Sequence, residues 1–245
     1  MHATRVRATV WSIAILLSLI AVSAALMRTL LALHIGPEYD RIAVSLFYGT
    51  VTADDVDDQQ AMKLRYEHYS GAILTHVISG GLFLAVALLQ FSRRFRARHI
   101  RWHRRIGRVL VACAAVAALS GLWFGVIVPY AGAGEVSSIG LFGFLLLIAL
   151  IMAVRAIRRG DVARHREWMI RAFALCAAAA TVRLVAVPIE LFTHMRLRPL
   201  MAYSFWAGWS IILVAAESWI RMTRLRQIES AAGSGGAPVV VSGTV

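Results

Sequence analysis

The stretch R-R-F-R-A-R-H-I-R-W-H-R-R-I-G-R, residues 93–108, carries eight arginines and lies between two long apolar runs. So much positive charge cannot lie in the hydrocarbon core of a bilayer, where a single arginine is already costly. A second stretch, residues 158–171, has the same elements: clustered arginines, a His-Arg pair, a Trp and an Arg before the next apolar run. The two stretches therefore predict the side of a membrane on which the neighbouring helices begin or end.

The overall composition is that of an integral membrane protein. Hydrophobic residues make up 59% of the chain and charged residues 16%, against about 25% charged residues in soluble domains. The net charge of +13 would suit nucleic-acid binding only if the basic residues covered one face of a soluble domain. Because they lie between apolar runs instead, we exclude nucleic acid. We expect anionic lipid as the electrostatic partner, attracted by about 1 kcal/mol per basic residue.

Six apolar runs have the length of about 20 residues that a helix needs to cross a bilayer. They are continuously apolar, whereas the strands of a membrane barrel alternate between apolar and polar residues. We therefore predict a single all-α domain over residues 1–229, an integral membrane bundle of six transmembrane helices. The first run resembles a signal peptide near residues 22–25, but it continues well past that point, so we expect it to remain as a span. The predicted spans are residues 8–33, 70–91, 106–128, 138–157, 168–187 and 200–220.

The basic residues also predict the orientation of the bundle. Nineteen lysines and arginines lie at one set of span ends and five at the other. By the positive-inside rule, both termini are cytoplasmic. The acidic segment 34–69 is then an outer loop, and the small, Gly-rich segment 230–245 is a flexible cytoplasmic tail.

Small residues indicate which spans lie at the centre of the bundle. The third span carries Gly121 and Gly125, and the fifth carries four alanines at residues 177–180. Small side chains let membrane helices approach closely. We therefore expect the third and fifth spans at the centre.

Ionisable residues within spans are costly and point to function. His76 lies about two turns inside the outer end of the second span, although a plain hydrogen bond to a neighbouring helix would also account for it. Arginines in the same half of the bundle can instead extend to the headgroups. We predict a polar cluster in the outer half, formed by Arg28, His76, Arg183, Glu190 and His194, with His34 nearby.

The histidines at the inner span ends allow two interpretations. In the first, His103 and His165 are the axial ligands of a haem b, and arginines meet its propionates. In the second, the same histidines and the neighbouring Trp102 and Trp168 anchor the helices at headgroup level. No span carries histidines at two depths, which argues against a two-haem cytochrome. The candidate haem-binding residues are His76, His103, His165, Arg108 and Arg171.

Arginines of the two stretches are also predicted to form basic belts that face lipid headgroups. The two cysteines lie inside apolar runs and have neither a disulfide framework nor metal-ligand spacing, so we predict no metal site. The belt residues are Arg93, Arg94, Arg104, Arg105, Arg158, Arg159 and Arg166.

Transport and catalysis have weaker support in the sequence. Glu217 lies inside the sixth span near its inner end, as a residue of a proton or small-solute pathway would, but no continuous polar line joins it to the outer cluster. The chain has no zinc-protease, nucleophile-elbow, Walker or dinucleotide motif. We therefore expect no catalysis of the kind that soluble enzymes perform.

Three motifs carry a resemblance to a known family. They are H-x-x-S-G-G-L-F-L beginning at His76, W-H-R-R-I-G-R at residues 102–108, and H-R-E-W-M-I-R-A-F-A-L at residues 165–175. Over residues 70–220 the chain resembles a family of predicted bacterial multi-pass membrane proteins catalogued as a domain of unknown function. The resemblance implies a multi-pass topology and a place in the bacterial inner membrane, and it implies no reaction.

The leading hypothesis is an accessory or scaffold subunit of a membrane complex, which contacts anionic lipid or partner subunits through its cytoplasmic arginine and histidine belts. The alternatives are a haem-b electron-transfer subunit and a transporter of protons or a small solute.

Overall fold

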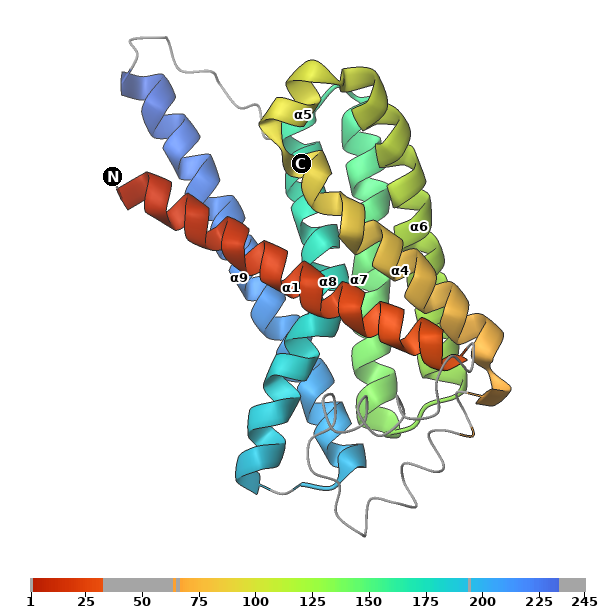
Figure 1. Cartoon of the computed structure of the whole chain (residues 1–245). Coiled ribbons are helices and arrows are strands. Elements are labelled where there is room, and N and C mark those ends of the chain that lie inside the picture. Colours follow the sequence, from red (N-terminus) through yellow and green to blue (C-terminus); the bar gives the residue numbers. More distant parts are fainter. Residues whose placement is uncertain (1, 33–63, 65–66, 194, 234–245) are drawn as a thin grey trace.

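A computed structural model describes residues 2–32, 64, 67–193 and 195–233, and in this part of the chain all regular structure is helical. Six helices each contain an apolar window long enough to cross a bilayer, which confirms the predicted all-α bundle of six spans (Figure 1). A seventh, short helix, α5, joins α4 to α6. The helices are α1 (His2–Ala32), α4 (Ser70–Phe91), α5 (Arg93–Arg98), α6 (Ile100–Ile127), α7 (Ala133–Arg158), α8 (Val162–Thr193) and α9 (Leu197–Gly233).

Several helices are longer than the predicted spans. α6 and α8 begin inside the two arginine-rich stretches, and α9 continues to Gly233, so residues 230–233, predicted as the start of a flexible tail, are helical. Arginine is a good helix former, so a helix can continue past the hydrocarbon into the headgroup layer. Most of the predicted acidic loop, residues 34–63, and the tail from residue 234 lie outside the described residues.

The stretch 93–108 reverses the chain between α4 and α6. The backbone of Ser92 is extended, and its Oγ accepts a hydrogen bond from the Phe95 amide (3.3 Å), which caps α5. The chain turns again at His99 and enters α6. The α7–α8 connection is tighter, because Gly160 has a positive φ of 79° that favours glycine.

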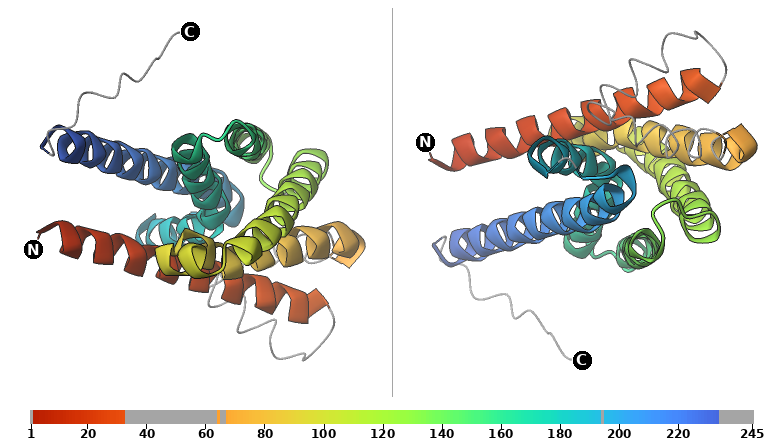
Figure 2. Two further views of the ribbon diagram at one scale, coloured as in Figure 1. Left: turned by 90° about the horizontal axis from the view of Figure 1, so that it is seen from above. Right: turned by 90° about the horizontal axis from the view of Figure 1, so that it is seen from below.

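α8 lies at the centre of the bundle, beside α1, α4, α7 and α9. Half of its apolar window is buried, compared with 22–33% in the other five candidate spans, and Figure 2 shows it between α1 and α9. Its buried residues are mostly alanines, which permit close approach on several sides. The prediction for the fifth span therefore agrees with the structure.

The prediction that the third span is central is wrong, because α6 lies at the side of the bundle against α4 and α7. Its two glycines make room for side chains of those two neighbouring helices. A Cβ on Gly121 would meet the ring of His76 on α4 at 2.8 Å, and a Cβ on Gly125 would collide with Ile139 on α7. Small-residue spacing thus indicated close packing correctly but did not identify the partners.

The backbones of α8 and α9 approach closely at Gly208. A Cβ at this position would lie 2.7 Å from the backbone Cα and N of Val182. Backbone atoms cannot rotate away as a flexible side chain can, so the two helices would have to separate.

We therefore expect Gly208→Ala to destabilise the protein by about 1–3 kcal/mol, the usual range for overpacking. The measurement is the free energy of unfolding in mixed micelles, titrated with a denaturing detergent. Gly140→Ala on α7 is the matched control, since a Cβ there would meet nothing within 4 Å. Equal stability of the two variants would contradict the close α8–α9 contact.

Candidate functional site

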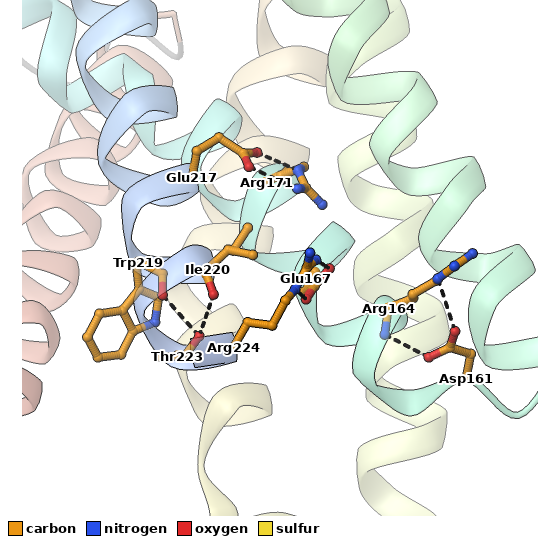
Figure 3. A network of polar contacts seen from close by, with 9 residues as sticks. All are labelled: Asp161, Arg164, Glu167, Arg171, Glu217, Trp219, Ile220, Thr223 and Arg224. Atoms are coloured by element: carbon orange, nitrogen blue, oxygen red, sulfur yellow. Dashed lines mark hydrogen bonds and ion pairs between the residues drawn. The ribbon is translucent and has the colours of Figure 1, made fainter. Parts of the chain in front are cut away.

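Two reciprocal ion pairs join α8 to α9 (Figure 3). Arg171 Nε donates to Glu217 Oε1 at 2.5 Å and its Nη2 donates to Oε2 at 2.9 Å. One turn earlier on α8, Glu167 accepts from Arg224, with Nε–Oε1 at 3.0 Å and Nη2–Oε2 at 2.6 Å. Each helix supplies one acid and one base, so the pairs fix both the antiparallel direction and the register of α8 on α9.

The Arg171–Glu217 pair lies within the candidate spans of both helices, Val162–Thr193 and Arg198–Leu225. The side chain of Arg171 is 19% exposed, and its guanidinium also lies over the ring of Trp168, 4.5 Å from the ring centre. A charge at this depth is tolerated when it is paired and hydrogen-bonded. Arg171 was a candidate contact for haem propionates and Glu217 for a proton pathway, and the structure uses both to hold α8 against α9.

Two of the candidate histidines bond to backbone carbonyls of neighbouring helices. His76 Nδ1 lies 2.7 Å from the carbonyl oxygen of Ala117 on α6, and His165 Nδ1 lies 2.9 Å from that of Ala153 on α7. A carbonyl can only accept, so in both residues Nδ1 carries the proton and donates it to the neighbouring helix. His76 therefore makes the interhelical hydrogen bond that was the alternative to a functional role.

The predicted outer cluster is described only in part. Arg183 donates to the carbonyl of Ala179 in its own helix, while His76 bonds across to α6. Arg28 on α1 and Glu190 on α8 are both half-buried. The remaining candidates, His194 and His34, lie outside the described residues.

The predicted basic belts divide into two groups. Arg166 is half-buried near the start of α8 and lies within electrostatic range of Arg93 and Arg96 on α5 and of Arg7 on α1. Arg108, a haem candidate at the first turns of α6, is exposed. The other six belt residues are also exposed, namely Arg93, Arg94, Arg104, Arg105, Arg158 and Arg159.

A polar cluster at the α4–α5 elbow was not predicted. Arg96 Nη1 donates a hydrogen bond to the backbone carbonyl of Gln90 in the last turn of α4 (3.0 Å). The side-chain amide of Gln90 and Nδ1 of His103 are buried, and neither has a hydrogen-bond partner among the described residues. Arg96 lies within electrostatic range of His103, as does His165. The signal that would have indicated this cluster is Gln90 itself, a polar residue in the last turn of the second predicted span.

The acidic and histidine side chains do not assemble into a metal centre within the described ranges, where no three His, Cys, Asp or Glu residues are grouped closely enough to hold an ion. Cys113 and Cys176 are free thiols, half-buried on different helices. The chemistry that this end of the bundle offers is therefore the binding of anions by guanidinium groups and the donation of imidazole lone pairs.

The two ion pairs should differ in their contribution to stability. Glu217→Gln leaves Arg171 unpaired at membrane depth, and we expect a loss of roughly 3–5 kcal/mol of unfolding free energy. Glu167→Gln is the matched control, because the side chain of its partner Arg224 is 58% exposed, and it should cost less than about 1 kcal/mol. The double variant Arg171→Met/Glu217→Leu should recover most of the loss. Equal effects of the two single variants, measured by denaturing-detergent titration, would contradict this difference.

Comparison with known proteins agrees with this architecture. A sequence model of DUF2306, described as a predicted membrane protein family, matches residues 73–220, which span α4 to α9 and include both arginine-rich connections. Neither a curated protein nor a solved structure gives a significant match. Because the matched region covers more than half of the chain, and because the six apolar helices are those of a membrane protein, the chain belongs to the DUF2306 family of predicted membrane proteins.

Proposed function

We propose that the protein is an accessory or scaffold component of the bacterial inner membrane, which contacts anionic lipid headgroups or partner subunits through its arginine belts. The observation that carries the proposal is the exposure of six of the seven belt residues. In the described part of the chain none of the six has an acidic partner within ion-pair distance. Guanidinium groups in this state are available to headgroup phosphates or to acidic residues of another protein.

The position of the belts supports the same function. The α4–α5–α6 connection and the α7–α8 connection lie at one end of the bundle (Figure 1). By the positive-inside rule this end faces the cytoplasm. Large apolar side chains such as Leu19, Leu119 and Phe144 are exposed on the helices between the two ends, as a surface in contact with lipid chains requires.

The test is the preference of the reconstituted protein for phosphatidylglycerol over phosphatidylcholine, measured by quenching of tryptophan fluorescence with brominated lipids. We expect Arg→Gln changes at Arg94, Arg104, Arg105, Arg158 and Arg159 to reduce the preference at least tenfold, since each basic residue near the surface contributes about 1 kcal/mol. The preference of the wild type should also weaken in high salt.

Arg→Lys changes at the same five positions form the matched control, because they keep the charge and should keep the preference. A wild type without any preference for phosphatidylglycerol would contradict the lipid-binding role.

A second candidate function, electron transfer by a haem b, is favoured by the hydrogen bond of His165. Histidines that bind metals usually donate their other ring N–H to a carbonyl or carboxylate, as His165 donates to Ala153. His103 on α6 lies within electrostatic range of His165. An iron held by these two imidazoles would supply one-electron transfer. Arg171 is engaged by Glu217, so Arg166 or Arg104 would have to meet the propionates.

The haem candidate predicts a Soret absorption band in protein purified from haem-supplemented cells. The band should be lost in His103→Ala and His165→Ala, and it should persist in His99→Ala, which changes an exposed histidine of the same stretch. A colourless, fully folded preparation would exclude this candidate.

A further inference from the structure

One group of side chains at the cytoplasmic end differs from the rest of the belts because it is partly buried and converges from several helices. It consists of Arg96 of α5, Arg166 of α8, and Gln90 and His103 at the α4–α6 contact, and we call it the elbow cluster. The exposed Arg93 of α5 lies within electrostatic range of both arginines. Arg96 and Arg166 are half-buried, whereas the neighbouring Arg94 is exposed. A residue that only faces lipid headgroups has no need of this burial.

The charges of the elbow cluster are of one sign. Arg166 lies within electrostatic range of Arg93, Arg96 and Arg7. The acid that acts on it, Glu167, accepts hydrogen bonds from Nε and Nη2 of Arg224. Burial, followed by the charge of Arg93, lowers the pKa of the Arg96 guanidinium below its usual value. Guanidinium groups in proteins keep their protons. The repulsion between these arginines therefore persists unless an anion is present.

The uncharged members of the cluster also lack partners. Both the amide nitrogen and the amide oxygen of Gln90 are buried without a hydrogen bond in the described part of the chain, and the same is true of His103 Nδ1. The amide oxygen of Gln90 lies 3.7 Å from the position that a Cβ on Gly107 would take. Gly107 is one helical turn from His103 on α6. The Gln90 amide and the His103 ring therefore belong to the same contact between α4 and α6. Buried polar groups are nearly always satisfied, and exceptions call for an explanation such as a bound ion.

Hydrogen-bond donors and positive charge therefore converge from α4, α5, α6 and α8. Arginine suits phosphate because its planar fork can form two parallel hydrogen bonds with phosphate oxygens. Basic sites between membrane helices on the cytoplasmic side are places where lipid headgroups bind. Lysine, a point charge, would serve a purely electrostatic surface equally well.

We infer that the elbow cluster is a binding site for one anionic phosphate group, held by the guanidinium groups of Arg96 and Arg166, with the Gln90 amide and His103 as further hydrogen-bonding groups. The phosphate belongs either to the headgroup of an anionic phospholipid or to a small soluble phosphate. The inference rests on the proposed function and deepens it, because it replaces a general charge attraction at this place by a single site of defined geometry.

The experiment measures the unfolding temperature of the full chain in an uncharged detergent. The probes are dioleoylphosphatidylglycerol, with dioleoylphosphatidylcholine as its control, and inorganic phosphate, with sodium chloride at matched ionic strength as its control. A ligand that binds only the folded state raises the unfolding temperature in a saturable way. Stabilisation by phosphatidylglycerol alone identifies a lipid headgroup, and stabilisation by inorganic phosphate identifies a soluble source. Stabilisation by neither probe beyond its control would overturn the inference.

Variants separate a defined site from general charge. Arg96→Lys and Arg166→Lys keep the charge but lose the fork, so each should need about tenfold more probe for the same shift. Arg94→Lys, an exposed residue of the same short helix, is the matched control and should respond like the wild type. Identical responses of Arg96→Lys and Arg94→Lys would overturn the site and leave the proposed lipid-binding role intact.

A further variant remains informative if an arginine change prevents folding. Gln90→Leu removes the unsatisfied amide at nearly constant volume, so it should leave the unliganded protein at least as stable while weakening the response to the probe. Destabilisation of the unliganded protein with an unchanged response would show that Gln90 is a structural residue and would overturn its assignment. Conversely, if inorganic phosphate stabilises the protein but vesicles reveal no preference for phosphatidylglycerol, the proposed function fails and the site stands.

Discussion

The Arg171–Glu217 ion pair satisfies the constraint on which the rest of the bundle depends, namely that a charge at membrane depth must have a partner. Its two hydrogen bonds at 2.5 and 2.9 Å tie the central helix α8 to α9. The Glu167–Arg224 pair repeats the connection one turn earlier on α8 with the charges exchanged. Sliding α9 by one turn would break both pairs, so the register of these helices follows from electrostatics rather than from apolar packing, which discriminates weakly among registers in lipid.

Packing then completes what the ion pairs begin. The alanines of α8 and Gly208 of α9 bring the two backbones together. On the other side of the bundle, Gly121 leaves room for the imidazole of His76, whose hydrogen bond to Ala117 joins α4 to α6. His165 makes the corresponding bond from α8 to α7. In both places a backbone carbonyl of the neighbouring helix accepts a hydrogen bond from the imidazole. Such directional contacts are absent from surfaces that face lipid.

The arginines at the basic end of the bundle have three different environments. Arg171 and Arg224 are paired with acids and hold helices together. The exposed belt residues, such as Arg94 and Arg105, have no acidic partner in the described part of the chain. Arg96 and Arg166 are half-buried with further positive charge around them. Arginines of the two basic stretches and of α9 therefore occupy paired, exposed and half-buried environments, and a change of the same residue type should have different consequences at neighbouring positions.

The sequence by itself determined the fold class, because apolar runs of about 20 residues leave the backbone no other way to satisfy its hydrogen bonds in lipid than to form helices. It also determined the family through the motifs around His76, Trp102 and His165. The hydropathy of a segment depends only on its own residues, so each membrane span could be recognised without knowledge of its neighbours in space.

Only the tertiary structure decided which residues meet. Arg171 and Glu217 are 46 positions apart, and nothing in the local pattern of either helix distinguishes a partner from a candidate propionate contact or a proton carrier. The small residues of α6 were recognised, but whether they faced α8 or the neighbours α4 and α7 depended on how the helices are arranged around each other. The burial of Arg96 and Arg166 likewise depends on how α5 folds back against α4 and α6 and lies near α8, and this long-range geometry distinguishes the two residues from the exposed arginines.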